Sequence, residues 1–372
     1  MDTEVAIVGA GIAGTALAWA LAPRARVLLL EREDQPGVHS TGRSAAMFME
    51  SYGPPQARAL TRASRAFYAA PPAGFVETPI LSPRGALYVA WSAHAAQLAE
   101  TERSLRATGT AIEHLSPADT LARVPALRPA DLLGALWEAD AMDVDVDALH
   151  QGYLRGARRH GAVLHCGAEL ASARRERAAW TLVLTDGRRL RAERLVNAAG
   201  AWADTVAQRC GSPPQGLQPK RRSAFTFDPP TDLAWRDWPV TAAIDERWYF
   251  KPDAGQLLGS PANADPVPAH DVLPEELDIA TAIHEISLDT TLQIRRPRRS
   301  WAGLRTFSPD GELVIGADAH GLFWLAGQGG YGIQSAQGAA MLAAGILCGE
   351  ALADGLRAQG VNAAAMAPRV RS

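Results

Sequence analysis

Three glycines near the N-terminus, Gly9, Gly11 and Gly14, have the Gly-x-Gly-x-x-Gly spacing of a phosphate-binding turn. Gly9 permits a tight turn, Gly11 lets the backbone approach a pyrophosphate, and Gly14 lets a helix and a strand pack closely. About twenty residues further along, Glu31 supplies a carboxylate that can accept hydrogen bonds from a ribose without a 2′-phosphate. Together these four residues predict a binding site for an adenine dinucleotide.

The segments around these residues have the order that such a site needs. Residues 5–8 form an apolar run, residues 12–22 are rich in alanine, and residues 27–30 form a second apolar run that Glu31 ends. This order predicts a strand, a helix and a second strand, with the free N–H groups and positive dipole of the helix N-terminus directed at the phosphates. A nucleotide-free turn of the same kind is the alternative, and the complete unit makes it the weaker one.

Size and composition limit the possible functions. The chain has 372 residues, of which 47% are hydrophobic, and we expect two domains because single hydrophobic cores stop growing near about 250 to 300 residues. A net charge of −3 without a basic run argues against nucleic acid as a partner. Cys166, Cys210 and Cys348 lie far apart without metal-ligand spacing, so we expect neither a disulfide framework nor a metal site.

Residues 5–22 carry no charge and resemble a signal peptide or a membrane span. Asp2 and Glu4 precede them, whereas a signal peptide needs a positively charged N-terminal region. We therefore expect a cytoplasmic protein without integral membrane association, whose first strand starts almost at Met1.

The rest of the chain continues to alternate between helical and strand patterns. Helices are expected at residues 56–69, 93–108, 119–124, 147–160 and 274–286. Strands are expected at residues 87–91, 163–166, 179–184, 189–191, 195–199, 313–316 and 322–326. The turn Asp186-Gly187 is typical of a β-meander.

This pattern predicts an α/β fold with a discontinuous, Rossmann-like cofactor domain and a second domain built on a mostly antiparallel sheet. The cofactor domain is expected to comprise residues 1–47, 141–215 and 304–372. The second domain, which supplies the substrate site, is expected to comprise residues 48–140 and 216–303.

A second glycine-rich segment precedes the last long helix, which is expected to run to about residue 351. Gly327, Gly329, Gly330 and Gly332 would let backbone and the positive helix end lie against a flavin ring, whose reduced form is anionic at N1–C2=O. The N-terminal motif does not distinguish NAD from FAD, so this segment is the feature that favours FAD. A glycine-rich helix cap without a ligand is the alternative.

Several segments together resemble the D-amino-acid oxidase superfamily of flavoproteins, and most closely its bacterial FAD-dependent D-arginine dehydrogenases. They are the Gly9–Gly14 motif and residues 37–46 (GVHSTGRSAA), 218–225 (QPKRRSAF), 248–255, 301–305 (WAGLR) and 328–334 (QGGYGIQ). The resemblance implies noncovalent FAD and a two-domain fold like that of p-hydroxybenzoate hydroxylase. It also implies oxidation of a D-amino acid to an imine, which water hydrolyses to a 2-oxo acid and ammonia.

The N-terminal motif and the resemblance together indicate which residues contact FAD. The expected residues are Gly9, Gly11, Ala13, Gly14, Glu31, Arg32, Ser40, Thr41, Arg43, Ser44, Ala45, Ala199, Gly200, Trp202, Gly329, Gly330, Tyr331, Gly332 and Ile333.

An amino-acid substrate needs its carboxylate held so that Cα–H faces flavin N5, and the planar forks of arginine do this best. The resemblance implies that Arg222 and Arg305 bind the carboxylate and that Tyr249 adds a hydrogen bond. It implies that Tyr52 forms a lid or wall of the pocket. An exposed surface position for either arginine is the alternative. The residues implied on the flavin side are Gly330, Tyr331 and Gln334.

The chain departs from its arginine-specific relatives at the far end of the pocket. After residues 81–84 (LSPR) those relatives carry an acid for the cationic end of the substrate, and this chain has Gly85-Ala86. Met47 and Met49 stand where the relatives have polar residues. We therefore expect an uncharged, fairly large apolar substrate side chain, such as that of leucine, methionine or phenylalanine. Glu50 would accept a cation only if its loop bends differently.

The sequence leaves more than one electron acceptor and more than one reaction type open. Oxidases of the superfamily often place a lysine near the flavin, and Gln256–Gly259 has none, which favours a dehydrogenase that passes electrons to a quinone or another redox carrier. The cysteine that tethers flavin in sarcosine-oxidase relatives has no counterpart near Leu304. The alternatives are an oxygen-using amino-acid or amine oxidase similar to glycine or sarcosine oxidase, a flavin monooxygenase suggested by residues 316–318 (Gly-Ala-Asp), and a noncatalytic flavin-binding module.

Overall fold

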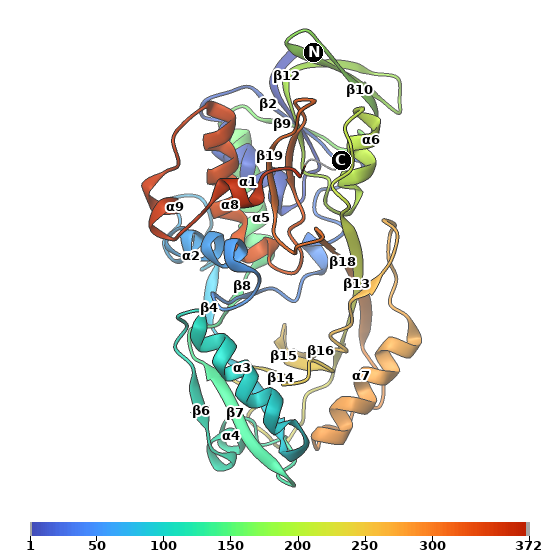
Figure 1. Cartoon of the computed structure of the whole chain (residues 1–372). Helices are drawn as coiled ribbons and strands as arrows, with labels where there is room; N and C mark the ends of the chain where they lie inside the picture. The colour runs from blue at the N-terminus through green and yellow to red at the C-terminus, as the bar shows by residue number, and fades with distance from the viewer. Residues whose placement is uncertain (1, 370–372) are drawn as a thin grey trace.

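The computed structural model describes residues 2–369 and contains two large β-sheets, one above the other in Figure 1. The first sheet carries the N-terminal strand and most of the long helices, and the second sheet carries the remaining helices at the lower end. Strands β13 (Gln218–Phe227) and β18 (Arg299–Phe307) pair antiparallel along their whole length and run between the two parts of the molecule. The expected α/β class is confirmed.

The first sheet is built around the N-terminal unit. Strand β1 (Asp2–Val8) pairs in parallel with β2 (Val27–Leu30) and β12 (Arg189–Asn197), and helix α1 (Ile12–Leu21) connects β1 to β2 as predicted. The other strands of this sheet are β9 (Val163–His165), β10 (Leu170–Glu176), β11 (Ala179–Leu184), β19 (Val314–Ala317) and β20 (Phe323–Ala326).

The meander is present, with Gly187 at a φ of 86° in the turn between β11 and β12. The prediction of two strands at residues 189–191 and 195–199 is wrong, because β12 runs without a break from Arg189 to Asn197. Its first residues pair antiparallel with β11 and the remainder pairs parallel with β1, so the connecting residues are also held by ladder bonds.

Side chains of alternate residues on β1 enter two different cores. Val5 and Ile7 pack with α1 and with the helices α2 (Pro55–Ala69) and α8 (Gly332–Cys348). Ala6 and Val8 pack with α6 (Ala203–Arg209) and the meander on the opposite face. Helix α5 (Val146–Arg159) lies against α1. The first sheet is therefore covered on both faces, as parallel strands require.

The second sheet has the strand order β17-β13-β16-β15-β14-β5-β7-β6, with β18 also paired to β13. Within it only β5 and β14 pair in parallel, so the expected mostly antiparallel sheet is confirmed. The strands not yet given are β5 (Ala86–Trp91), β6 (Glu113–Leu115), β7 (Leu132–Glu138), β14 (Val240–Ala243), β15 (Tyr249–Asp253), β16 (Gln256–Ser260) and β17 (Asp265–Pro266). Helix α7 (Glu276–Asp289) packs on this sheet through Ile279, Ala282 and Ile286.

A small third sheet joins the two parts on the other side of the molecule. It consists of β3 (Met47–Phe48), β8 (Met142–Val144) and β4 (Leu81–Pro83), in the order β3-β8-β4. The remaining helices are α3 (Ala95–Ala107), α4 (Pro117–Arg123) and α9 (Asp354–Ala358), with short 3-10 turns at Thr41–Arg43, Ser92–His94, Gly200–Trp202 and Ala363–Met366.

Most predicted helices agree with the structure to within a few residues. The helix expected at 93–108 begins instead with the Ser92–His94 turn, and the last long helix ends at Cys348 rather than near residue 351. Gly349 has a φ of 70°, a left-handed conformation that stops the helix there.

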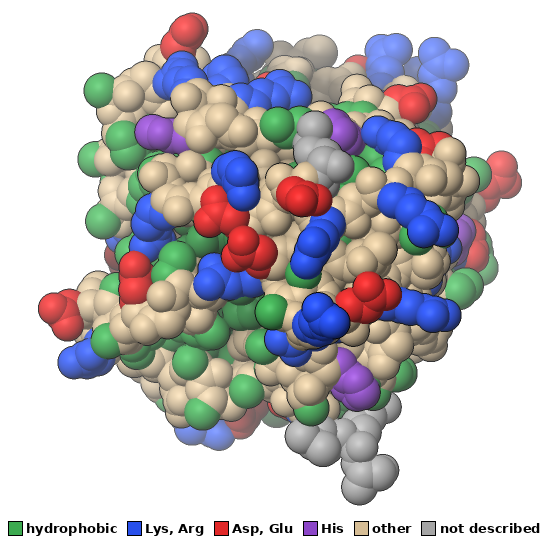
Figure 2. All heavy atoms as spheres, turned by 90° about the horizontal axis from the view of Figure 1, so that it is seen from above, with side chains coloured by type: hydrophobic (Ala, Val, Ile, Leu, Met, Phe, Trp, Pro, Cys, Tyr) green, Lys and Arg blue, Asp and Glu red, His purple; other side chains and the backbone are tan. Residues whose placement is uncertain are grey.

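The surface charges seen in Figure 2 are mixed, in agreement with the small net charge of the chain. On the face seen in Figure 2, Lys and Arg side chains are interspersed with Asp and Glu rather than gathered by sign. No helix within residues 2–369 combines the length and apolar character needed to cross a membrane. The expected domain boundaries stay a prediction, and β18 runs across one of them.

Candidate active site

A cavity of about 420 Å³ is lined by residues of both large sheets. Its walls include every expected cofactor-contact residue except Gly14 and Tyr331. They also include Tyr52, Arg222, Tyr249, Arg305, Gly330 and Gln334 from the expected substrate site. The fold therefore brings almost all the candidate residues together.

Gly14 does not line the cavity, and its role is to let helix α1 pack closely against the turn at Gly9. A Cβ atom on Gly14 would lie 1.9 Å from the carbonyl oxygen of Gly9, so helix α1 approaches the turn as closely as glycine allows. Gly9 itself has a φ of 103°, and a Cβ there would lie 2.4 Å from the carbonyl oxygen of Ala198. Both glycines are required by the backbone geometry that the motif predicted.

Glu31 follows β2 and is fixed by two backbone hydrogen bonds. Its Oε2 accepts from the N–H of Ala10 at 2.9 Å, and its Oε1 accepts from the N–H of Glu33 at 3.1 Å. The side chain is 8% exposed and lines the cavity. Each oxygen retains a lone pair, so the carboxylate can still accept from a ribose.

The loop at residues 37–46 is held over the N-terminus of α1. Thr41 Oγ1 accepts from the N–H of Ile12 at 3.0 Å, and Ser40 Oγ donates to the carbonyl oxygen of Leu304 at 2.5 Å. Gly11, the N-cap residue of α1, has no side-chain cap of its own. Ser40 and Thr41 were expected to contact FAD, and their hydroxyls also tie this loop to α1 and β18.

Arg43, like Ser40 and Thr41, holds the loop at residues 37–46 in place. Its guanidinium donates to the carbonyl oxygens of Val38, Val272 and Ala302 at 2.9–3.1 Å and forms an ion pair of 2.5 Å with Asp271. All of these contacts are to protein groups, so Arg43 joins the loop to β18.

Arg32 and His39 frame the indole of Trp202 at one end of the cavity. The Arg32 guanidinium carbon lies 4.9 Å from the indole centroid, and the His39 ring centroid lies 4.6 Å from it. His39 Nε2 is 2.9 Å from Glu33 Oε1. The sequence reasoning missed His39, although it lies within the segment at residues 37–46.

The first residues of α8, Gly332 and Ile333, line the cavity, and the N-terminus of this helix has no side-chain cap. Gln328, which also lines the cavity, has a buried Nε2 with no protein partner within residues 2–369. A Cβ on Gly330 would lie 2.7 Å from the Arg305 guanidinium, so this loop passes close to that side chain. An open helix N-terminus and an unpaired buried donor fit a ring that carries acceptors.

Arg222 on β13 and Arg305 on β18 enter the cavity from paired strands. Arg222 Nε donates to the carbonyl oxygen of Asn263 at 2.6 Å, and Arg305 Nη2 donates to the hydroxyl of Tyr52 at 3.0 Å. Arg305 Nε is buried without a partner. In the described part of the chain, neither guanidinium has a carboxylate within ion-pair distance.

The two guanidinium groups also act on each other. Burial, followed by the positive charge of Arg305, lowers the pKa of Arg222 from its ordinary value. Two cations that share a cavity without a counter-ion are electrostatically unfavourable until an anion binds between them. The site therefore has the charge and the planar donor geometry to bind a carboxylate.

Two expected site residues have other contacts. Tyr331 is 3% exposed and does not line the cavity, because its hydroxyl donates to the carbonyl oxygen of Gly311 and its ring packs behind Tyr52. Gln334 lines the cavity, but its Nε2 donates to Met49 O at 3.1 Å, Tyr52 O at 3.2 Å and Thr61 Oγ1 at 3.0 Å. Both residues support the Tyr52 loop.

The far end of the cavity is mostly apolar. Its lining residues there are Met47, Met49, Ala86, Val240 and Ala242. Glu50 forms an ion pair with Arg65 and is absent from the cavity wall, so it supplies no free acid. Tyr88 packs on these apolar residues, and its hydroxyl donates to the buried carboxylate of Glu138 at 3.4 Å.

Neither lysine of the chain lines the cavity. Lys251 is 5% exposed and forms an ion pair of 2.6 Å with Asp143, and Lys220 Nζ lies 5.2 Å from the ring centroid of Phe307. The described residues contain no group of three or more His, Cys, Asp or Glu side chains that could hold a metal ion.

Comparison with known proteins identifies the group to which this site belongs. The family described as FAD dependent oxidoreductase, DAO, matches residues 4–346. The chain belongs to the DAO family. FAD is therefore its cofactor, and the dinucleotide turn, Glu31, the open N-terminus of α8 and the unpaired Gln328 amide are the features that fit it.

Several solved structures share the fold of this DAO-family protein. Glycine oxidase from Geobacillus kaustophilus has a TM-score of 0.85 and 23% identity over 100% of this chain and 99% of that chain. L-proline dehydrogenase from P. horikoshii has a TM-score of 0.80 and 18% identity over 94% of each chain. Iminodiacetate oxidase from Chelativorans sp. BNC1 has a TM-score of 0.80 and 22% identity over 98% of this chain and 99% of that chain.

Proposed function

We propose that this protein is an FAD-dependent D-amino-acid dehydrogenase. It oxidises the Cα–N bond of a D-amino acid to an imine, which water hydrolyses to a 2-oxo acid and ammonia. The observation that carries the proposal is the pair of cations, Arg222 and Arg305, which line one cavity with the cofactor residues and have no carboxylate partner among residues 2–369. The preference for the D enantiomer rests on the resemblance to bacterial D-arginine dehydrogenases.

In this proposal the two arginines clamp the substrate carboxylate, and Tyr249 and Tyr52 border the same site. Charge-assisted bonds to two planar forks fix both the position and the rotation of the carboxylate, which aims Cα–H at the cofactor. FAD, when bound, supplies the acceptor for the hydride. The clamp contributes by orientation, because a small displacement of the reacting carbon would reduce the rate.

The substrate ammonium must lose a proton before its nitrogen can form the imine. His39 is the one described histidine in the cavity wall, and it is already engaged with Glu33 and Trp202. The unbalanced charges of Arg222 and Arg305 lower the pKa of a nearby ammonium by repulsion. We therefore assign the proton acceptance to water.

The side-chain preference follows from the far end of the cavity. Met47, Met49 and Ala86 offer no acid to a cationic side chain, and Glu50 is paired with Arg65. Burying an unpaired guanidinium costs roughly 2 to 5 kcal/mol, so D-arginine should be used at least about thirtyfold less efficiently than by relatives that carry the acid. Uncharged, fairly large side chains are the proposed substrates.

We propose a quinone or another redox carrier as the electron acceptor, because neither Lys220 nor Lys251 lies in the cavity wall. An oxygen-using amine or amino-acid oxidase is the second candidate, because glycine oxidase and iminodiacetate oxidase share this fold. Preferred oxidation of a substrate with a small or absent side chain would favour this oxidase over the proposed dehydrogenase.

The test is anaerobic reduction of the FAD-loaded protein by a panel of D- and L-amino acids, glycine and sarcosine, followed by reoxidation with a dye or with oxygen. We expect bleaching of the flavin by D-leucine, D-methionine or D-phenylalanine and faster reoxidation by the dye. Bleaching by L-amino acids alone, or by glycine and sarcosine alone, would contradict the proposal. No bleaching by any compound would indicate a noncatalytic module.

A further inference from the structure

The orientation of Arg222 depends on one backbone carbonyl. Its Nε donates to the carbonyl oxygen of Asn263 at 2.6 Å. Because Nε is used in this way, the guanidinium plane is fixed at its inner edge and the two Nη atoms form the outer edge of the fork. The position of the Asn263 peptide therefore decides where the fork points.

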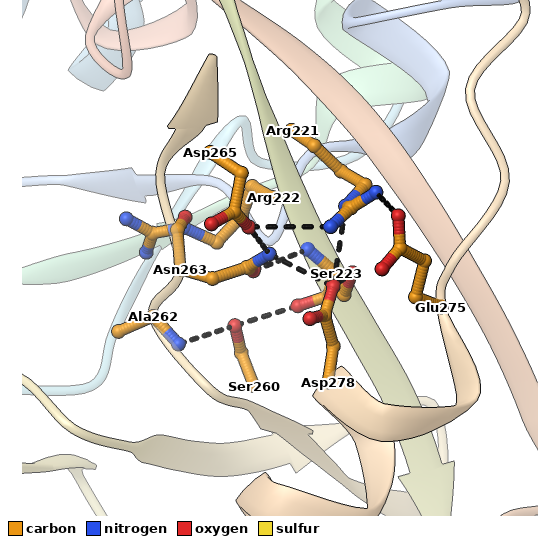
Figure 3. A network of polar contacts seen from close by, with 9 residues as sticks. All are labelled: Arg221, Arg222, Ser223, Ser260, Ala262, Asn263, Asp265, Glu275 and Asp278. Carbon is orange, nitrogen blue, oxygen red and sulfur yellow. Dashed lines mark hydrogen bonds and ion pairs between the residues drawn. The ribbon is translucent and has the colours of Figure 1, made fainter. Parts of the chain in front are cut away.

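The side chain of Asn263 fixes that peptide from three directions, as Figure 3 shows. Its Oδ1 accepts from the N–H of Ser223 at 2.8 Å, on the same strand as Arg222. Its Nδ2 donates to Asp265 at 2.6 Å and to Asp278 on α7 at 3.0 Å. The amide is thus bonded to β13, to β17 and to helix α7.

The loop itself is held in an unfavourable conformation. Ala262, which lines the cavity, has a φ of 51°, in the left-handed region that a non-glycine residue adopts at a cost. Its N–H donates to Ser260 Oγ at 3.1 Å, and that hydroxyl donates to the carbonyl oxygen of Ser223 at 2.7 Å. A turn of this kind persists only when surrounding bonds determine it.

The acids around Asn263 form ion pairs with Arg221, the residue before Arg222. Arg221 and Arg222 leave β13 in opposite directions in Figure 3. Arg221 forms ion pairs with Glu275, with Asp265 at 3.4 Å and with Asp278 at 3.2 Å. The charge of Arg221 is therefore neutralised on the far face of β13, and none of these three acids forms an ion pair with Arg222.

We propose that Asn263 is a positioning residue for carboxylate recognition. Its side-chain amide holds the strained turn so that its own carbonyl aims the Arg222 fork into the cavity. The inference rests on the proposed function, in which Arg222 binds the carboxylate, and assigns to Asn263 the geometry of that binding.

The test measures binding of pyruvate to the FAD-loaded protein through the flavin absorbance, together with KM and kcat for D-leucine. Asn263→Ala removes the three side-chain bonds, and we expect the Kd of pyruvate and the KM to rise about tenfold, with kcat changed less than about twofold, because one to two hydrogen bonds to a charged partner lose their alignment. Asn263→Asp should behave similarly, since it loses both donors and adds a charge beside two acids.

A double-mutant cycle separates positioning from general destabilisation. Lysine has no Nε donor and cannot use the Asn263 carbonyl in the same way, so Asn263→Ala should change the pyruvate Kd less than about twofold when Arg222→Lys is already present. Glu275→Gln is the matched control, because it weakens the ion pair of Arg221 on the opposite face and leaves the Asn263 bonds in place. We expect Glu275→Gln to change the Kd less than about twofold.

An equal effect of Asn263→Ala with and without Arg222→Lys would overturn the inference, as would an unchanged Kd in the single variant. Pyruvate binding needs no turnover, so wild-type protein that binds pyruvate but oxidises no D-amino acid would contradict the proposed function alone. Wild-type protein that binds no carboxylate would overturn both.

Discussion

Arg305 donates a hydrogen bond from Nη2 to the hydroxyl of Tyr52 at 3.0 Å, which joins a strand of the second sheet to the loop that borders the cavity. The ring of Tyr52 in turn packs edge-on against the ring of Tyr331, with 6.2 Å between centroids. Gln334 holds the same loop through the carbonyl of Tyr52. The clamp and the pocket wall are therefore one connected unit.

Tyr52→Phe should weaken substrate binding through this unit. The variant keeps the ring packing and removes the hydroxyl that fixes Arg305. We expect the KM for D-leucine to rise about tenfold, since a hydrogen bond to a charged group contributes about 1.5 kcal/mol at the lower end of its range. Steady-state kinetics with a dye acceptor measure this effect. A KM equal to that of the wild type would show that Tyr52 does not orient Arg305.

Replacement of Arg222 or Arg305 by lysine should raise the KM more than Tyr52→Phe does. Arg222→Lys and Arg305→Lys keep the charge and remove the planar fork, and we expect each KM to rise about 10- to 100-fold because one charge-assisted hydrogen bond of about 1.5 to 3 kcal/mol is lost. Arg299→Lys on β18 is the control, since Arg299 is exposed and does not line the cavity. Equal KM values for all three variants would contradict the clamp.

Ala86→Glu should shift the substrate preference toward cations. Ala86 lies at the apolar end of the cavity, opposite Glu138 in the β5–β7 register. We expect the ratio of kcat/KM for D-arginine to that for D-leucine to rise at least about tenfold, because pairing a buried guanidinium recovers part of the roughly 2 to 5 kcal/mol that an unpaired one costs. Ala86→Gln, which has nearly the same size and no charge, should leave the ratio within about threefold of the wild type.

Gly14→Ala should disrupt the dinucleotide turn. The new methyl group would overlap the carbonyl oxygen of Gly9, at a separation of 1.9 Å, and backbone must move to relieve the overlap. We expect a loss of about 1 to 3 kcal/mol in the free energy of unfolding and weaker FAD binding, measured by urea denaturation and by flavin fluorescence.

Gly345→Ala on α8 is the matched control for Gly14→Ala, because a Cβ at Gly345 would have no atom within 4 Å. It should stabilise the protein by about 0.5 to 1 kcal/mol, since alanine favours a helix interior over glycine. A Gly14→Ala variant as stable as this control would refute the packing argument.

Glu138 should make stability fall as pH rises. Burial raises the pKa of its carboxyl above the ordinary value of 4.5, although Ser51 Oγ donates to it at 2.7 Å. Between 4.5 and the raised pKa the folded state binds more protons than the unfolded state, so the free energy of unfolding declines through that interval.

Glu138→Gln removes this titration. Relative to the wild type, the variant should therefore be more stable at about pH 8 than at about pH 5, as measured by urea denaturation at both pH values. A stability difference between the two proteins that is independent of pH would rule out a raised pKa in the folded state.

Local features of the sequence were sufficient for the N-terminal unit and for most helices and strands. The spacing of Gly9, Gly11 and Gly14 and the apolar runs on either side describe contacts between segments close in sequence, and their strand and helix periods are visible without any long-range information. The break expected between residues 191 and 195 failed for the opposite reason, because pairing with β1 and β11 carries β12 through it.

The sequence alone also indicated the set of residues that meet at the cavity, because a resemblance over nearly the whole chain carries information about distant contacts. It did not indicate what each side chain bonds to. Tyr331 and Gln334 were assigned to the flavin side of the pocket, and the tertiary structure instead gives their polar groups to Gly311 and to the Tyr52 loop.

The charge balance of Arg221 and Arg222 was decided only by the tertiary structure. Adjacent in sequence and equal in type, they leave β13 in opposite directions (Figure 3). Arg221 meets three acids, Asp265 on β17, Glu275 just before α7 and Asp278 on α7, whereas Arg222 meets the carbonyl of Asn263 and the ring of Tyr249. The resemblance implied a carboxylate-binding role for Arg222, but residue types along the chain do not show which arginine is neutralised, because Coulomb interactions depend on distances in space.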